Sequence, residues 1–397
     1  MAFKSGRHFL QIPGPSAIPD RVLRAIDRPV LDHRGPEFQR LAQEILAGLG
    51  PVFGTTGPVI VFPGTGTGAW EAAIVNTLSP GDSVLMYETG HFATLWQTMA
   101  VRFGLDVTFV PGDWRHGVDP ADVEARLRGD TGRRIKAVMV VHNETSTGIT
   151  NRIADIGAAI KRVDHPALLM ADTVSGLGSI DYQHDAWGVD VTVAGSQKGL
   201  MMPAGLSFNA VSAKALAASK TGGMPRSYWD WADMLGMNAT GFFPYTPATN
   251  LLYGLKESLA MLAEEGLPQV FARHARHGAA TRAAVRAWGL DNQAADPREF
   301  SDVVTTVVMP DGHDADALRA VVLDQFDMSL GAGLARLKGH VFRIGHLGHF
   351  NDLMLMGALS GVEMGLHAAG VPHRLGGAAA AMDALAGRDV RAEQKAA

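Results

Sequence analysis

Short apolar runs alternate with longer amphipathic stretches through most of the first half of the chain. Seven of these runs are expected to form strands, at residues 58–62, 83–87, 106–110, 135–141, 167–171, 189–193 and 206–210. Between them, stretches 66–78 and 150–163 place apolar residues at the spacing of a helix that packs on a sheet. Strands that alternate with helices predict an α/β fold around a mostly parallel, doubly wound sheet.

The second half of the chain has a different pattern. Residues 249–290 are predicted to form one long helix that leads to a second lobe, and 301–370 alternate strand and helix signals in a smaller α+β domain. The Ala-rich end is expected to be a surface helix or a frayed tail. We divide the chain into an N-terminal arm, a large domain, a small C-terminal domain and a tail, at 1–20, 21–260, 261–375 and 376–397.

Composition excludes several classes of protein. A length of 397 residues exceeds what one core normally serves, and 47% hydrophobic with 19% charged residues suits a globular chain. A net charge of -5 disfavours nucleic acid and anionic membranes as partners. The chain has no cysteine, and no apolar stretch approaches the ~20 residues of a membrane span. No signal-peptide pattern is found at the N-terminus, so a cytoplasmic location is expected.

A glycine cluster, FPGTGTGAWEAA at residues 62–73, follows a predicted strand and opens a predicted helix. Backbone N–H groups at such a helix start form a site for an anion such as phosphate, and the hydroxyl of Thr67 could reach a phosphate oxygen. The cluster lacks the Lys-Ser/Thr pair of a Walker A loop and fits the dinucleotide fingerprint only loosely. A plain tight turn is the alternative.

Two isolated charges follow buried strands. Lys198 comes directly after VDVTVAGSQ, and Asp172 ends the run ALLMAD, so both lie where open α/β sheets bind ligands. A partly buried lysine can act as an amine nucleophile, and a carboxylate beside a ring nitrogen keeps that nitrogen protonated. The alternatives are a Lys paired with an acid at the rim of the sheet and an Asp that caps a helix.

A third strand end carries the polar run HNETSTG, residues 142–148. The four elements together are those that pyridoxal phosphate requires: a phosphate cradle, a partner for the ring nitrogen, hydrogen bonds to the ring substituents and an amine. We therefore expect pyridoxal 5'-phosphate as the cofactor.

The motifs also occur in a characteristic order: GTGTGAWEAAIVN, ETGHF, HNETSTG, ADTVSGLG, GSQKG and VFRIGHLG. This order resembles the alanine:glyoxylate and serine:glyoxylate aminotransferases, a class V group within the fold type I pyridoxal phosphate enzymes. The resemblance runs from about residue 13 to about residue 370. It implies transfer of the amino group of an L-amino acid to glyoxylate, giving glycine and a 2-oxo acid, with serine or aspartate as donor and alanine also possible.

The resemblance also implies roles for single residues. Lys198 would form the Schiff base and move the α-proton of the substrate, and Asp172 would pair with the ring nitrogen. Phe92 in ETGHF would stack on the ring, and Ser146 or Thr147 would contact the ring hydroxyl. The phosphate would be bound by Gly66, Thr67, Gly68 and Gln197.

Further residues are expected to bind the phosphate across subunits or to bind substrate. The segment FFPYTPATN resembles one that reaches the phosphate of the neighbouring subunit, which implies a homodimer in which Tyr245 and Thr246 complete the partner's site. Arg343, inside the apolar run HVFRIGHLG, would clamp the substrate carboxylate, with an internal salt bridge as the alternative. His33 and Arg34 resemble a pair that receives an anionic side chain, or they cap the helix that follows.

Other patterns carry less weight. His346 and His349 lack a matching third ligand, so no metal site is predicted. The basic stretch 272–282 distributes its charges around a helix, as a solvated face does. Competing functions are a pyridoxal phosphate lyase acting on a hydroxy-amino acid, a non-catalytic ligand sensor on the same fold, and a nicotinamide-dependent enzyme.

Overall fold

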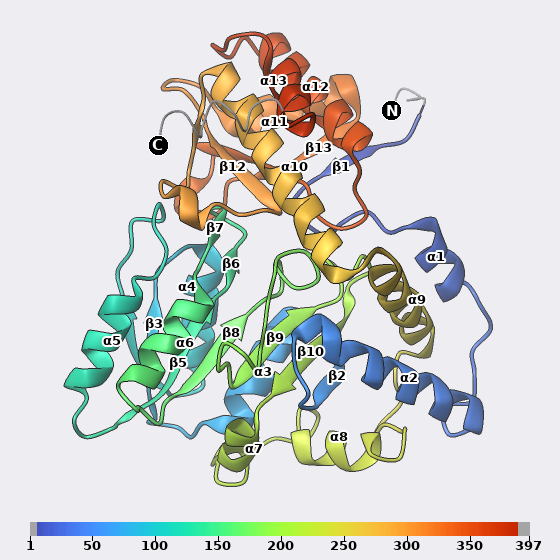
Figure 1. Cartoon of the computed structure of the whole chain (residues 1–397), viewed down its shortest axis with the longest axis vertical. Helices are drawn as coiled ribbons and strands as arrows, with labels where there is room; N and C mark the ends of the chain where they lie inside the picture. Colours follow the sequence, from blue (N-terminus) through green and yellow to red (C-terminus); the bar gives the residue numbers. More distant parts are fainter. Residues whose placement is uncertain (1–5, 388–397) are drawn as a thin grey trace.

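A seven-stranded sheet forms the centre of the larger part of the protein in the computed structural model, which describes residues 6–387 (Figure 1). Its strand order is β2-β10-β9-β8-β5-β3-β4, and only β10 is antiparallel to its neighbours. The strands are β2 (Val59–Gly64), β3 (Ser83–Tyr87), β4 (Asp106–Val110), β5 (Ile135–Val141), β8 (Leu168–Asp172), β9 (Val191–Gly195) and β10 (Gly205–Val211). All seven predicted strands are confirmed. They could be recognised in the sequence because strands of a parallel sheet that is covered on both faces are continuous apolar runs.

Helices cover this sheet and share one large hydrophobic core with it. They are α1 (Asp20–Ile26), α2 (Pro36–Phe53), α3 (Gly66–Thr77), α4 (His91–Arg102), α5 (Pro120–Gly129), α6 (Ile153–Arg162), α7 (Ala213–Ser219) and α8 (Trp231–Asn238). The register pairs Val141 of β5 with Asp172 of β8, and Asp172 with Val193 of β9. The carboxyl ends of these three central strands therefore lie side by side and carry the predicted site motifs to one edge of the sheet.

A second sheet and its helices form the smaller lobe, at the top of Figure 1. The sheet order is β1-β13-β14-β12-β11. Its elements are β1 (Phe9–Gln11), β11 (Asp291–Asn292), β12 (Val304–Val308), β13 (Met328–Ala332), β14 (Val341–Gly345), α11 (Ala315–Phe326), α12 (Asp352–Ala368) and the short helices η1 (Pro297–Glu299) and η2 (Ala335–Leu337). The N-terminal arm thus contributes an edge strand to the smaller lobe, a role that the sequence interpretation missed.

The predicted long helix over 249–290 is wrong as a single element. The structure has α9 (Thr249–Glu265) and α10 (Leu267–Trp288), separated at Gly266, whose φ of 82° lies outside the helical region. Glycine adopts this conformation without steric cost, and Pro268 suits the first turn of the next helix because it has no N–H to satisfy there. Only α10 runs on into the smaller lobe (Figure 1).

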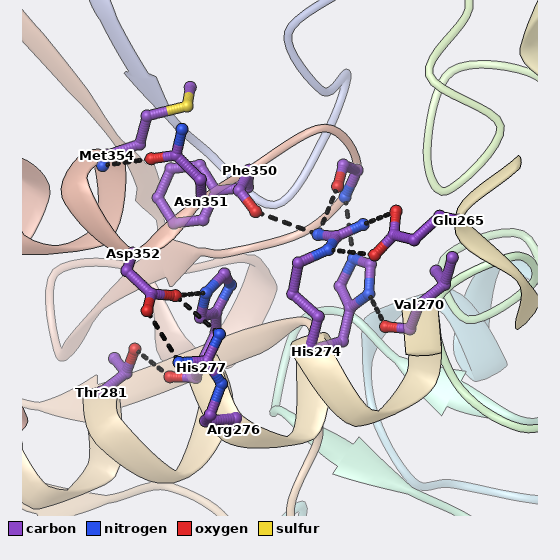
Figure 2. Close-up of polar contacts among 12 residues, drawn as sticks. Glu265, Val270, His274, Arg276, His277, Thr281, Phe350, Asn351, Asp352 and Met354 are labelled. Carbon is purple, nitrogen blue, oxygen red and sulfur yellow. Dashed lines mark hydrogen bonds and ion pairs between the residues drawn. The ribbon is translucent and has the colours of Figure 1, made fainter. Parts of the chain in front are cut away.

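Polar contacts join α10 to the loop that follows β14 (Figure 2). Asp352 accepts two hydrogen bonds from Arg276, at 2.7 and 2.8 Å, and one from His277 Nε2 at 2.9 Å. In the loop itself, the Gly348 amide donates a hydrogen bond of 3.0 Å to His274 Nε2. These contacts fix the loop after β14 and the first residue of α12 to the helix that connects the two lobes.

The Ala-rich stretch after residue 376 begins as α13 (Gly377–Leu385), which packs on α10 and α12 with Ala381 fully buried. The rest of the expected tail, 388–397, lies outside the described residues. Within residues 6–387 no helix is long and apolar enough to cross a membrane, and no group of side chains is arranged to hold a metal ion.

The hairpin of β6 (Asn143–Glu144) and β7 (Ile149–Thr150) directly follows β5. It therefore lies where the carboxyl ends of the central strands lie side by side.

Candidate active site

A cavity of about 260 Å³ lies at the carboxyl ends of β5, β8 and β9, against the start of α3. Six residues predicted for the site line it: Gly66, Thr67, Phe92, Asp172, Gln197 and Lys198. The structure therefore brings together side chains from four separate motifs, as the sequence interpretation expected for one crevice.

Lys198 lies in the loop that follows β9 and is 9% exposed. Its amine donates a hydrogen bond to the Pro13 carbonyl oxygen of the N-terminal arm. Gly14, with φ of 105°, allows this approach, because a Cβ atom there would lie 2.3 Å from Lys198 Nζ. Burial and the positive charge of Arg343 lower the pKa of Lys198 to about 8. The amine is therefore closer to its nucleophilic neutral form than a lysine in water.

Asp172, the last residue of β8, is 4% exposed and accepts a hydrogen bond of 2.8 Å from the Val174 amide. Burial raises the pKa of Asp172 to about 7, and the negative charge of Glu144 acts in the same direction. The charge of Lys198 opposes this rise only in part, and no described ion pair includes Asp172, so a protonated ring nitrogen in the cavity would give the carboxylate a partner.

Polar atoms without partners also face this region. Gln197 Oε1 is buried, belongs to a residue that lines the cavity, and has no hydrogen-bond partner among the described residues. The indole N–H of Trp70, which also lines the cavity, is directed at Asp172 and partly offsets the rise in its pKa. The first turn of α3 adds N–H groups that helix geometry leaves without intrahelical partners. These donors and the acceptor suit a polar, anionic ligand at the start of α3.

Gly68 and Phe92 have different positions relative to the cavity. Gly68, predicted to bind phosphate, does not line the cavity, and its amide donates to the Thr65 carbonyl oxygen at 2.8 Å. Phe92 lines the cavity from the first turn of α4, where a flat ligand could stack on it.

The hydroxyls of Ser146 and Thr147 point into the protein. Ser146 Oγ donates to Glu144 at 2.6 Å, and Thr147 Oγ1 lies 3.4 Å from two carbonyl oxygens. Neither residue lines the cavity, whereas Thr145 and Asn143 do. The motif was found from the sequence, but the choice of hydroxyl depends on the turn of the hairpin, and this geometry favours Thr145.

Arg343 lies on β14 and is 7% exposed. Its Nε donates to the Ala332 carbonyl oxygen at 2.7 Å and its Nη1 to the Thr145 carbonyl oxygen at 2.9 Å. None of the described ion pairs includes Arg343, although the negative charge of Glu144 acts on it from a greater distance, so the alternative of a direct internal salt bridge is not seen among the described residues. Burial lowers the pKa of Arg343 to about 10, and an anionic ligand would offset that cost.

Four predicted residues lie away from the cavity of their own chain. Tyr245 stacks on Tyr228, with ring centroids 4.4 Å apart, and donates to the Tyr228 carbonyl oxygen. Thr246 and Arg34 are exposed, and His33 Nε2 is buried without a partner among residues 6–387.

The two histidines considered as metal ligands also differ in position. His346 is buried and bonded to Thr305 Oγ1 and to the Asp302 carbonyl oxygen, whereas His349 is exposed. The first is part of the polar packing of the smaller lobe.

Comparisons with known proteins show the family to which this chain belongs. The family described as aminotransferase class-V matches residues 8–337. The chain belongs to the class-V aminotransferase family. It is 48% identical to a serine–glyoxylate aminotransferase of Methylorubrum extorquens, over 91% of this chain and 92% of the relative. It is 44% identical to an L-aspartate–glyoxylate aminotransferase of Paracoccus denitrificans, over 97% and 98% of the two chains.

The fold agrees with this assignment. The crystal structure of pyridoxamine-pyruvate aminotransferase from Mesorhizobium loti superposes with a TM-score of 0.91 at 28% identity, covering 96% of this chain and 98% of that one. The protein is therefore a fold type I aminotransferase, and its cofactor is pyridoxal 5'-phosphate. The cavity fits this cofactor, because it joins a buried amine, a buried carboxyl whose pKa is raised and the unpartnered Gln197 Oε1.

Proposed function

We propose that the protein transfers the amino group of an L-amino acid, serine or aspartate, to glyoxylate. The observation that carries this proposal is the common position of Lys198 and Asp172 in the wall of one cavity, where Arg343 donates to the carbonyl oxygen of the lining residue Thr145. The names of the two relatives, a serine–glyoxylate and an L-aspartate–glyoxylate aminotransferase, support the substrates.

The roles of the residues follow from their positions. Pyridoxal phosphate supplies an electron sink when bound. Lys198 would hold it and would take up and return the α-proton of the donor at Nζ. Asp172 would pair with the ring nitrogen, and Gln197, Thr67 and the start of α3 would bind the phosphate. Arg343 would bind the substrate carboxylate.

A homodimer is part of the same proposal. Tyr245 and Thr246 would complete the phosphate site of the partner subunit, and His33 and Arg34 would face its substrate. The position of all four outside their own cavity supports a role across subunits. Ser146 and Thr147 as cofactor contacts, and a cytoplasmic location, stay predictions.

A donor screen tests the substrates. Purified protein loaded with cofactor is given serine, aspartate or alanine, with glyoxylate as acceptor, and single-turnover rates are compared between wild type and Arg34→Ala. A loss confined to aspartate supports Arg34 as the receiver of a second carboxylate, whereas equal losses contradict it. Arg40→Ala, an exposed arginine nearby on α2, is the matched control. Turnover without glyoxylate would indicate a lyase instead.

Replacing Lys198 tests the chemistry itself. Lys198→Ala should still bind cofactor but lose transfer by about 10³-fold or more, since general acid–base groups contribute about 10²–10⁴-fold. Borohydride treatment should fix the cofactor covalently to residue 198 of the wild type, as detected by mass spectrometry, and should fix none to the variant. Lys220→Ala, on an exposed lysine, should change neither measurement. Retained turnover in Lys198→Ala would refute the assignment.

A further inference from the structure

The start of α4 has no cap of its own. The helix runs from His91 to Arg102, and the residue before it is Gly90, which has no side chain to accept a hydrogen bond from the first amides. The first turn nevertheless carries Phe92, which lines the active-site cavity. An uncapped helix end frays, so something else must hold this turn in place.

The buried carboxylate of Glu144 takes the place of the missing cap. Glu144, on β6, is fully buried. Its Oε2 accepts a hydrogen bond from the Ala93 amide at 3.0 Å, and its Oε1 lies 3.4 Å from the Phe92 amide. Ser146 extends the cap, because its hydroxyl donates to Glu144 at 2.6 Å and accepts from the His91 amide at 2.9 Å. All three amides of the first turn are thus bound by the hairpin that follows β5.

Gly90 makes this contact possible. A Cβ atom at residue 90 would lie 2.4 Å from Glu144 Cγ and 2.5 Å from Ser146 Oγ, which is too close for any other residue. The carboxylate also lies within the charged region around the cavity, as its charge acts on both Asp172 and Arg343. Thr145, the next residue, lines the cavity and accepts from Arg343.

We propose that Glu144 is a positioning residue: its carboxylate caps α4 from another element and so holds Phe92 against the cofactor and Thr145 in the cavity wall. The proposal rests on the proposed function, since it requires a bound cofactor. A negative charge at the positive end of the helix dipole adds to the stability of the cap. Without it, the ring of Phe92 would lose its fixed orientation, and small displacements in an active site are costly.

Glu144→Gln tests the proposal because it keeps the shape and one acceptor. The amide oxygen can replace Oε1, but the amino group then faces the Ala93 amide, donor against donor. In cofactor-free protein we expect faster hydrogen exchange of amides 91–93. In loaded protein we expect weaker cofactor binding, a smaller visible circular dichroism band of the cofactor, and kcat lower by about ten- to a hundredfold.

A double variant distinguishes positioning from a general loss of stability. If Glu144 acts through Phe92, Glu144→Gln should weaken cofactor binding far less in Phe92→Leu than in wild type. Asp119→Ala is the matched control, because Asp119 caps α5 through the Ala121 amide and does not line the cavity. It should leave the dichroism band unchanged.

The outcomes separate this inference from the function. Wild-type protein that binds no cofactor would overturn both. Wild-type binding with unchanged exchange, affinity and dichroism in Glu144→Gln, or additive losses in the double variant, would overturn the role of Glu144 alone. If Glu144→Gln does not fold, Ser146→Ala replaces it, since it removes only the hydroxyl that bridges Glu144 and the His91 amide. The same measurements apply, and no change would again refute the proposal.

Discussion

The amine of Lys198 lies in surroundings that favour its neutral form. Burial and Arg343 lower its pKa to about 8, while Asp172 acts in the opposite direction. We expect cofactor-free protein to capture pyridoxal phosphate at a rate that rises with pH through about 8, because only the neutral amine attacks an aldehyde. Stopped-flow absorbance across pH 6 to 10 measures this. A midpoint near the ordinary 10.5 of lysine would contradict the buried position.

The contribution of Arg343 can be measured in the same assay. Arg343→Gln removes a positive charge that disfavours the ammonium form, so the midpoint for capture should move to higher pH. Arg298→Gln, on an exposed arginine, is the control and should leave the midpoint in place. If both variants shift it equally, the charge of Arg343 has no special influence on the amine.

Asp172 should make the stability of the cofactor-free protein depend on pH. Burial raises its pKa to about 7 from 3.8, so the folded state binds this proton more tightly than the unfolded chain does. The stability that this group contributes is therefore complete below about pH 4 and is lost as pH rises through 7. The melting temperature of Asp172→Asn relative to wild type should increase between pH 4 and 7 and level off above it.

The bound cofactor supplies the control for Asp172. A protonated ring nitrogen would offset the buried carboxylate, so the advantage of Asp172→Asn at pH 8 should shrink or reverse once cofactor is added. Scanning fluorimetry of both forms measures the difference. A difference that does not vary with pH would mean that the carboxyl of Asp172 is not desolvated in the free protein.

At the scale of elements, the sequence predicts best those strands that are buried on both faces, because burial requires an apolar run. The strands before Asp172 and Lys198 are apolar runs that nothing but a covered sheet can accommodate, so their ends were found within a few residues. The break at Gly266 was missed because the apolar periodicity continues through it. The strand β1 was missed because three residues carry no periodicity, and its pairing with β13 is set by the tertiary fold.

The sequence was enough to find the motifs that form the site, but not always the residue within a motif that lines the cavity. Thr145, rather than its neighbours Ser146 and Thr147, lines the cavity because the β6–β7 hairpin turns the chain there, and Glu144 requires Ser146 as a partner. The role of Gly14 and Pro13 depends on a contact between the arm and Lys198 that spans most of the large lobe in sequence. The division into domains at 21–260 and 261–375 stays a prediction.

The contact between α10 and the start of α12 should contribute to stability (Figure 2). Arg276 and Asp352 form a two-bond ion pair, but their side chains are 44% and 43% exposed. A double-mutant cycle with Arg276→Ala and Asp352→Ala, followed by urea unfolding, should give a coupling of about 0.5–1 kcal/mol. Asp352→Ala alone should cost more than Arg276→Ala, because it also leaves buried His277 without its partner.

A matched pair checks that prediction. Arg128 and Glu124 form an ion pair within α5, so their coupling should be smaller, about 0.3–0.5 kcal/mol. Equal couplings in the two pairs would mean that the contact between α10 and α12 contributes no more than an ordinary surface pair.

At the scale of the whole molecule, apolar side chains remain exposed near the residues proposed to act in a partner's site. Val30 is 81% exposed and precedes His33 and Arg34, and Tyr228, 45% exposed, stacks on Tyr245. Large exposed apolar side chains of this kind are typical of an interface, and His33 Nε2 is buried without a partner among the described residues. These features favour a second copy of the chain at this face.

Mixing two inactive variants tests whether the site is shared between chains. Thr246→Glu places a carboxylate where the partner's phosphate would bind, and Lys198→Ala removes the amine. In a mixed dimer that shares its sites, one of the two sites receives both substitutions and the other receives neither. Co-refolded equal amounts should therefore recover about a quarter of wild-type activity. If Thr246 served its own chain, every site would carry a substitution and no activity would return. Lys198→Ala mixed with Asp172→Asn, two residues of one cavity, should likewise stay inactive, and gel filtration confirms that each mixture is dimeric.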